Sequence, residues 1–198
     1  MERGAEVRCI ASQTHRVGRD PGFTLIELIV TISVLAILTA LATPSFRSIM
    51  LNSRSASDAN NLLSLIILAR SEAVTRNRNV TLCKSADGNS CSTDANVGWH
   101  TGAVIFEDID GAGDIDAGTD VVIRSEVPVS SSSTLQGNSP VANRMTFNPL
   151  GRVASLGAAG GSITVMPSGL DEYRRRIVIA STRGPRICKP DDDPSDCP

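Results

Sequence analysis

The sequence predicts an α+β protein in which a long N-terminal helix, first apolar and then amphipathic, packs on a small antiparallel β-sheet domain. Two observations support this fold class. An apolar run from residue 23 is followed by a helical pattern of apolar residues up to about residue 77, and the rest of the chain consists of short β-rich runs separated by Gly, Pro, Asn and Ser. The 198 residues suffice for one such domain with a real core.

Residues 1–22 are polar and are expected to be a cleaved leader outside the fold, with arginines that favour the cytoplasmic side of a membrane. Residues 23–43 form the predicted transmembrane helix. Phe23 to Ala42 is a run of twenty residues with a single charge, and as a helix it spans about 30 Å, the thickness of a bilayer core. That charge is Glu27, which is costly to bury in lipid unless a partner compensates it.

The segment Gly22-Phe23-Thr24-Leu25-Ile26-Glu27 resembles the processing motif of the type IV pilin superfamily. In that superfamily a dedicated prepilin peptidase cuts between the residues matching Gly22 and Phe23, and the new N-terminal amine is then methylated. The glutamate matching Glu27 helps to dock the subunit by neutralising an amine at the base of the filament. The resemblance therefore implies cleavage at Gly22, N-methylation of Phe23 and a role of Glu27 in assembly. Its implied partners are prepilin peptidase and other major and minor pilins or pseudopilins.

Two other interpretations of this segment stay open. Ala40-Leu41-Ala42 is an A-x-A site after an apolar stretch, so an ordinary signal peptidase could cut after Ala42 and release a soluble protein. Its polar leader would be unusually long, and the acid inside the apolar region would be unexplained. Alternatively, Glu27 is an acid tolerated near the membrane interface. We favour prepilin processing over both.

Residues 44–77 are predicted to form an amphipathic helix, with a kink or local melting at Pro44, which lacks a backbone donor. Its apolar residues recur at steps of three and four and are expected to pack on the domain's own sheet. They are Phe46, Ile49, Met50, Ala56, Ala59, Leu62, Leu63, Ile66, Ile67, Ala73 and Val74. The polar face is expected to carry Arg47, Arg54, Asp58, Arg70 and Glu72.

Residues 78–198 are the predicted periplasmic β-rich domain. Only 3% of the chain is aromatic, and small residues are abundant, which suits short strands joined by many turns. The expected strands are residues 80–84, 99–107, 121–127, 144–147, 162–166 and 176–180. Ser130 to Ser133 and Gly157 to Gly161 are expected to be turn or linker segments.

The order of these runs resembles the GspH/FimT family of minor pilins and pseudopilins. The matching features are Leu82-Cys83, Gly98-Trp99 before Val104-Ile105-Phe106-x-Asp108, Phe147-Asn148-Pro149-x-Gly151, and Ile177-Val178-Ile179 with Arg186-Ile187-Cys188. The resemblance implies a non-enzymatic subunit of a type IV pilus or a type II secretion pseudopilus. It also implies a single-pass protein of the bacterial inner membrane with its C-terminal domain in the periplasm.

Four cysteines remain once the leader with Cys9 is removed, and they form two local pairs. An exported domain meets an oxidising compartment, so we expect disulfides Cys83–Cys91 and Cys188–Cys197. Neither pair has the C-x-x-C spacing of a zinc site.

An acidic loop contains Asp108, Asp110, Gly113, Asp114, Asp116 and Asp120. Calcium loops use carboxylates at fixed positions, but counting from Asp108 puts Ala112 and Thr119 where ligands should be. We therefore favour a solvated hairpin loop and expect no metal or cofactor. His100 is the one histidine after the leader, and catalytic motifs are missing from the sequence, so we expect no enzyme.

The basic C-terminal region offers a local polyanion site, although a net charge of −2 excludes a global positive field. Its residues are Arg174, Arg175, Arg176, Arg183, Arg186 and Lys189. In the FimT branch, which acts in natural transformation, a Gly-Arg-x-Arg stretch contacts DNA. Here the stretch is Arg183-Gly184-Pro185-Arg186, and acidic residues follow it, so DNA binding is the alternative function beside a solvated charged face.

Overall fold

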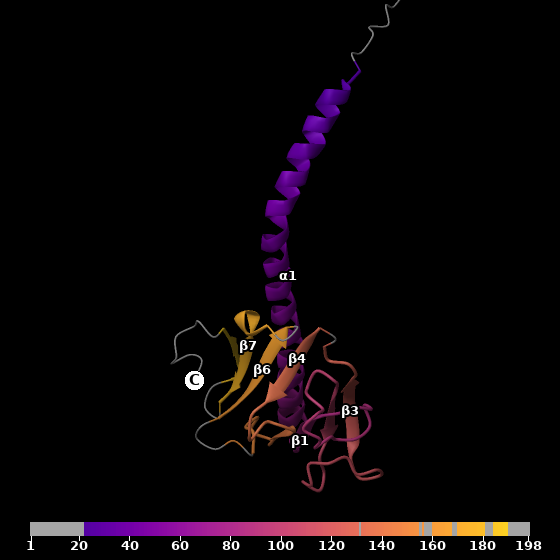
Figure 1. Ribbon diagram of the computed structural model, residues 1–198. Helices are drawn as coiled ribbons and strands as arrows, with labels where there is room; N and C mark the ends of the chain where they lie inside the picture. Colours follow the sequence, from indigo (N-terminus) through magenta and orange to yellow (C-terminus); the bar gives the residue numbers. More distant parts are fainter. Residues whose placement is uncertain are drawn as a thin grey trace, which may run out of the picture. The chain divides into compact units, whose positions relative to one another are not determined.

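The computed structural model describes residues 22–130, 132–154, 156, 160–167, 170–180 and 184–189 (Figure 1). The chain divides into two compact units, residues 1–43 and residues 44–198, which are described in turn. The elements are α1 (Leu25–Arg76), β1 (Val80–Lys84), β2 (Ala103–Glu107), β3 (Val121–Glu126), β4 (Ser133–Gly137), β5 (Arg144–Phe147), β6 (Gly161–Pro167), η1 (Asp171–Tyr173), β7 (Arg175–Ile179) and β8 (Arg186–Cys188).

The first unit contains the apolar N-terminal part of α1. Among the described residues, α1 is the helix whose length and composition would allow it to span a membrane, and the side chains of its apolar window are exposed. The helix continues through Pro44, where we expected a kink or local melting, so the proline does not end it.

The second unit contains the rest of α1 and both β-sheets. Residues Ala59, Leu62, Ile66, Ala69 and Ala73 are fully buried and follow one another at steps of three and four. They form one hydrophobic cluster with strand residues of both sheets. In Figure 1 this part of α1 lies behind the strands. The helix therefore provides the common core for the two sheets.

Part of the predicted apolar stripe does not enter this core. Phe46, Ile49, Ile67 and Val74 are exposed, so the prediction that they pack on the domain's own sheet is wrong. A helix covers a neighbouring sheet with only one face, and these side chains lie beyond it.

The predicted polar face also contains one error. Asp58 is buried. The hydroxyl groups of Ser132 and Ser133 donate hydrogen bonds to its Oδ2, at 3.1 and 2.5 Å. A carboxylate can be buried when hydroxyl donors replace water around it.

The strands form two four-stranded sheets with the orders β3-β2-β1-β5 and β4-β6-β7-β8. Every pairing between these strands is antiparallel. This arrangement confirms the predicted α+β fold class, with the strands divided between two sheets.

Strand boundaries show where local patterns mislead. Trp99 to Thr101 form a turn before β2, although the prediction began a strand at Trp99. Ser133 was expected in a turn, but it begins β4 and pairs with Pro167 of β6. The strand forms despite its polar composition because Leu135, opposite Val165, fills the core.

The two sheets differ in how they are covered. In β6 the burial alternates, as expected when one face meets the helix and the other faces outward. In β1 all five residues are buried, because a second cluster of Cys83, Val104 and Phe106 lies on the opposite face. Cys91 and Ile115, from two loops, pack on this cluster. The loops around residues 85–97 and 108–120 therefore cover the outer face of the first sheet.

Candidate functional site

The N-terminal motif, Gly22 to Glu27, contains the start of α1 at Leu25. Thr24 lies directly before the helix, and its Oγ1 accepts a hydrogen bond from the backbone N–H of Glu27 at 3.3 Å. Its carbonyl oxygen accepts the first helical bond, from the N–H of Leu28. Thr-x-x-Glu is the spacing of a capping box, and an acid in the first turn is favoured by the helix dipole. The motif thus keeps Glu27 in the first turn of α1.

The bond between Gly22 and Phe23 is sterically accessible. Among the described residues, a side chain at Gly22 would meet no atom within 4 Å beyond its chain neighbours, and Phe23 is 84% exposed. Glu27 is exposed as well. Cleavage at Gly22, methylation of Phe23 and the assembly role of Glu27 stay predictions.

The disulfide between Cys83 and Cys91 is confirmed. Cys83 belongs to β1 and points to the outer cluster, so the disulfide fastens the following loop onto the sheet. Cys188 ends β8 and is buried. Its expected partner, Cys197, lies outside the described residues, so this second pairing stays a prediction.

Asp87 organises the turn inside the disulfide loop. Its Oδ1 accepts hydrogen bonds from the backbone N–H groups of Asn89 and Ser90, both at 2.9 Å, and its Oδ2 accepts one from the Ser90 hydroxyl. These donors favour the ionised carboxylate, and the N–H of Asn89 contributes most to lowering the pKa of Asp87 well below its ordinary value. The turn is therefore stabilised by a charged acceptor.

Replacing Asp87 with alanine is expected to lower the melting temperature at pH 7 by about 2 to 4 °C. A carboxyl whose pKa is depressed by folding stabilises the fold above its unfolded pKa, and this contribution is lost as pH falls toward the folded pKa. The difference between wild type and variant should therefore shrink below about pH 4. Thermal unfolding followed by circular dichroism measures it. Glu172→Ala, which removes an exposed acid from η1, controls for charge alone, and a difference independent of pH would contradict the expectation.

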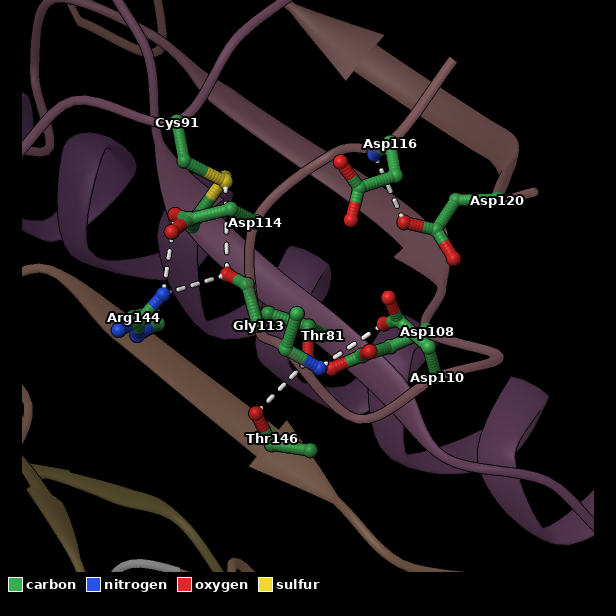
Figure 2. A network of polar contacts seen from close by, with 12 residues as sticks. Thr81, Cys91, Asp108, Asp110, Gly113, Asp114, Asp116, Asp120, Arg144 and Thr146 are labelled. Carbon is green, nitrogen blue, oxygen red and sulfur yellow. Dashed lines mark hydrogen bonds and ion pairs between the residues drawn. A yellow bond between two sulfur atoms is a disulfide. The ribbon is translucent and has the colours of Figure 1, made fainter. Parts of the chain in front are cut away.

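The acidic loop connects β2 to β3 and contains the carboxylates considered for calcium (Figure 2). One oxygen from each of Asp108, Asp110 and Asp120 lies within 4.8 Å of the others. Repulsion from Asp110 is the largest cause that raises the pKa of the nearby, exposed Asp116 above its ordinary value. Negative charge is therefore concentrated on this loop.

Arg144 of β5 holds the middle of the acidic loop. One guanidinium nitrogen, Nη1, donates to the carbonyl oxygen of Gly113 at 2.8 Å and to Asp114 at 2.9 Å. The Sγ of Cys91 lies 3.8 Å from the same carbonyl oxygen, so the disulfide and the acidic loop are in contact (Figure 2). Arg144 thus attaches the loop to the first sheet at Gly113 and Asp114.

The structure separates the predicted basic residues of the C-terminal region. Arg175 faces α1, where it donates to the hydroxyl of Ser55 at 3.0 Å and to the side chain of Asn52 at 2.7 Å. Arg174 pairs with Asp171 at 3.6 Å. These two arginines bind the chain's own groups, which matches a structural role better than a phosphate contact.

Of the remaining basic residues, Arg176 lies in β7 and Arg186 lies in β8. Arg176 pairs with Cys188 and Arg186 with Val178, so the two arginines share the outer face of the second sheet. Lys189 follows β8 directly, and Arg183 lies outside the described residues. DNA binding through these residues stays a prediction.

His100 has a structural contact. Its Nδ1 accepts a hydrogen bond from the backbone N–H of Leu135 at 3.2 Å, which links the turn before β2 to β4. His100 was predicted to lie in a strand over residues 99–107, and this contact was missed, as was the burial of Asp58. Both contacts join residues far apart in the chain, so the residues next to His100 or Asp58 in the sequence do not predict them.

Comparison with known proteins identifies two matching family models. The type II transport protein GspH family matches residues 58–183. The prokaryotic N-terminal methylation motif matches residues 19–43, which include Gly22, Phe23 and Glu27. No curated protein sequence matches the chain.

Solved structures with a similar fold include two minor subunits. The type IV minor pilin FimU of Pseudomonas aeruginosa is 19% identical, with a TM-score of 0.50 over 67% of this chain and 91% of that chain. The minor pseudopilin EpsH from the type 2 secretion system of Vibrio cholerae is 11% identical, with a TM-score of 0.46 over 70% of this chain and 99% of that chain. The family match covers more than half of this sequence, and the fold agrees with the first of these structures. The chain therefore belongs to the GspH family of the type IV pilin superfamily and carries its N-terminal methylation motif.

Proposed function

We propose that the chain is made as a prepilin and acts as a non-enzymatic minor subunit of a type IV pilus or a type II secretion pseudopilus. Prepilin peptidase cuts it between Gly22 and Phe23. Before assembly, the mature protein crosses the inner membrane once through the apolar part of α1, and residues 44–198 lie in the periplasm. DNA binding through the C-terminal arginines is the alternative.

The observation that carries this proposal is the exposed apolar part of α1. Its large apolar side chains, from Leu25 to Leu41, are each about half exposed or more. Removing one such side chain from water contributes about 1.5 to 3 kcal/mol, so a helix with this surface needs lipid or neighbouring helices. A helix that is first embedded in a membrane and later packed among other subunits meets this requirement at both stages.

The partners follow from the same segment. An exposed cleavage site with the N-terminal methylation motif supports prepilin peptidase as the processing enzyme. The second unit has exposed apolar residues of its own on α1, namely Phe46, Ile49 and Ile67. They provide further contact area for the helices of other pilins or pseudopilins.

Replacing Gly22 with arginine is expected to prevent most of the processing, because the peptidase must accommodate this residue next to the cut bond. In the part of the chain that the structure describes, a side chain at Gly22 meets nothing within 4 Å beyond its chain neighbours, so folding should be unaffected. Mass spectrometry of the N-terminus measures the result, with Gly22→Ala as the control that adds the smallest side chain. The wild type should begin at methylated Phe23. A wild-type chain that begins at Thr43 would instead indicate an ordinary signal peptidase.

A further inference from the structure

The two ends of the acidic loop are brought together by the register of a β-hairpin. Asp108 follows β2 and Asp120 precedes β3, and the last residue of β2, Glu107, pairs with the first residue of β3, Val121. Asp108 and Asp120 therefore face each other across the open end of the hairpin. Asp110 lies beside them, and Figure 2 shows the three carboxylates in one region, with Asp116 next to Asp120.

Asp108 carries the observation that points to a ligand. It is only 2% exposed, and its Oδ2 accepts a hydrogen bond from Thr81 Oγ1 at 2.8 Å. The Oγ1 of Thr81 is also hydrogen-bonded to the Oγ1 of Thr146 on the neighbouring strand, at 2.7 Å. The other oxygen, Oδ1, is buried without a hydrogen-bond donor in the described part of the chain. A buried carboxylate oxygen without a partner is costly, and a bound cation would remove that cost.

The positive charges near the loop are directed to other acids. Arg144 pairs with Asp114, and Arg76 and Arg78 pair with Glu107. Within the described residues, no ion pair reaches Asp108, Asp110 or Asp120. The described side chains therefore form no ion pair that would offset negative charge on these three carboxylates.

Backbone groups hold the other two carboxylates in place. Asp120 accepts hydrogen bonds from the N–H of Ile109 at 3.0 Å and of Asp116 at 2.9 Å, and Asp110 accepts one from Ala112 at 2.9 Å. An oxygen that accepts one hydrogen bond keeps a second lone pair for a metal. The loop is thus arranged around its carboxylates before any ion binds.

The spacing and chemistry fit calcium. Calcium is bound by oxygen at about 2.3 to 2.6 Å, so two of its ligands can be up to about 5 Å apart. One oxygen from each of the three carboxylates lies within 4.8 Å of the others. A site that is partly exposed, at Asp110, leaves room for water ligands, and carboxylates without cysteine or histidine favour a hard cation.

We propose that Asp108, Asp110 and Asp120 bind a calcium ion that joins the two ends of the β2–β3 loop. The bound ion stabilises the cover that this loop forms over the outer face of the first sheet, where Ile115 packs on the Cys83 cluster. The site does not follow the register of a linear calcium loop, because its ligands come from the two sides of a hairpin. Sites in extracellular modules have dissociation constants of about 0.1 to 1 mM, and we expect the same range here.

Calorimetric titration and thermal unfolding of the full chain in detergent test this site, with calcium chloride compared against EGTA. About 10 mM calcium should raise the melting temperature by about 3 to 10 °C, and sodium chloride of equal ionic strength should not. Binding heat should indicate a single ion per chain. The absence of both heat and thermal shift would overturn the proposal, as would equal shifts with sodium chloride.

Three substitutions separate ion binding from loop structure. Asp110→Asn keeps the acceptor for Ala112 and should weaken calcium binding by about tenfold or more. Asp108→Asn should abolish the calcium response while leaving the melting temperature in EGTA equal to or above that of the wild type, because it removes an uncompensated charge. The matched control is Asp114→Asn, in the same loop but paired with Arg144, which should keep the full response. A full response in Asp110→Asn and Asp108→Asn would contradict the assignment.

Discussion

Replacing Trp99 with alanine is expected to lower the free energy of unfolding by about 3 to 5 kcal/mol, the largest effect of any single side chain considered. Trp99 is fully buried, and its Nε1–H donates to the carbonyl oxygen of Val141 at 3.1 Å. Its backbone N–H donates to the carbonyl oxygen of Leu135 in β4, although Trp99 itself precedes β2. The residue therefore joins the two sheets, and its removal leaves a cavity at their junction.

The expected change in melting temperature is about 6 to 20 °C, measured by circular dichroism on the full chain in detergent. Trp99→Phe keeps most of the packing but removes the Nε1–H donor, and it should cost about 1 to 3 kcal/mol. Leu150→Ala, at a side chain that is 74% exposed, should change stability by less than about 0.5 kcal/mol. If Trp99→Ala unfolded at the same temperature as Leu150→Ala, the junction would not depend on this side chain.

Replacing Glu27 with alanine should reduce incorporation of the subunit into filaments by about tenfold or more, while processing and membrane insertion continue. Removing an acid from the apolar helix lowers the cost of insertion by about 2 to 3 kcal/mol, so the membrane step should not suffer. Docking should suffer, because the carboxylate is proposed to pair with an amine in a surrounding of low dielectric constant. Losing one partner there leaves the other charge unpaired.

Incorporation is measured as the amount of the subunit in sheared or purified filaments relative to the amount in the membrane. Glu27→Gln keeps the shape of the side chain and should be as defective as Glu27→Ala, which assigns the effect to charge. Thr31→Ala is the matched control one turn farther along, since the Thr31 hydroxyl bonds only to its own helix, at the carbonyl oxygen of Leu28. Filaments that contain Glu27→Ala at the wild-type level would exclude the docking role.

Features that depend on neighbours in the sequence were predictable. The apolar half of α1 follows from composition, and its buried half follows from the spacing of Leu62, Ile66 and Ala73. The Cys83–Cys91 disulfide joins a residue of β1 to a residue of the loop that follows, at a sequence separation of 8. The strands that were predicted well, such as β1 and β5, have local β propensity that agrees with their burial.

Features that depend on distant partners were not predictable. Asp58 lies among polar neighbours in the helix, and its burial depends on Ser132 and Ser133, more than seventy residues away. β4 has little apolar character and forms because β6 offers it a partner at a fixed register. Local patterns describe a side chain, whereas burial also depends on what the fold places opposite to it.

The N-terminal processing motif and the acidic loop illustrate the two cases. The sequence alone determined that Gly22 to Glu27 precedes a helix apolar enough for a membrane, because length and hydropathy are properties of consecutive residues. It also supplied the acids of the β2–β3 loop, but their linear spacing argued against a calcium site. Only the tertiary structure brought one oxygen from each of Asp108, Asp110 and Asp120 within 4.8 Å of the others, and it buried Asp108 Oδ1 without a hydrogen-bond donor in the described part of the chain. The physical reason is that hairpin register, rather than spacing along the chain, decides which carboxylates meet.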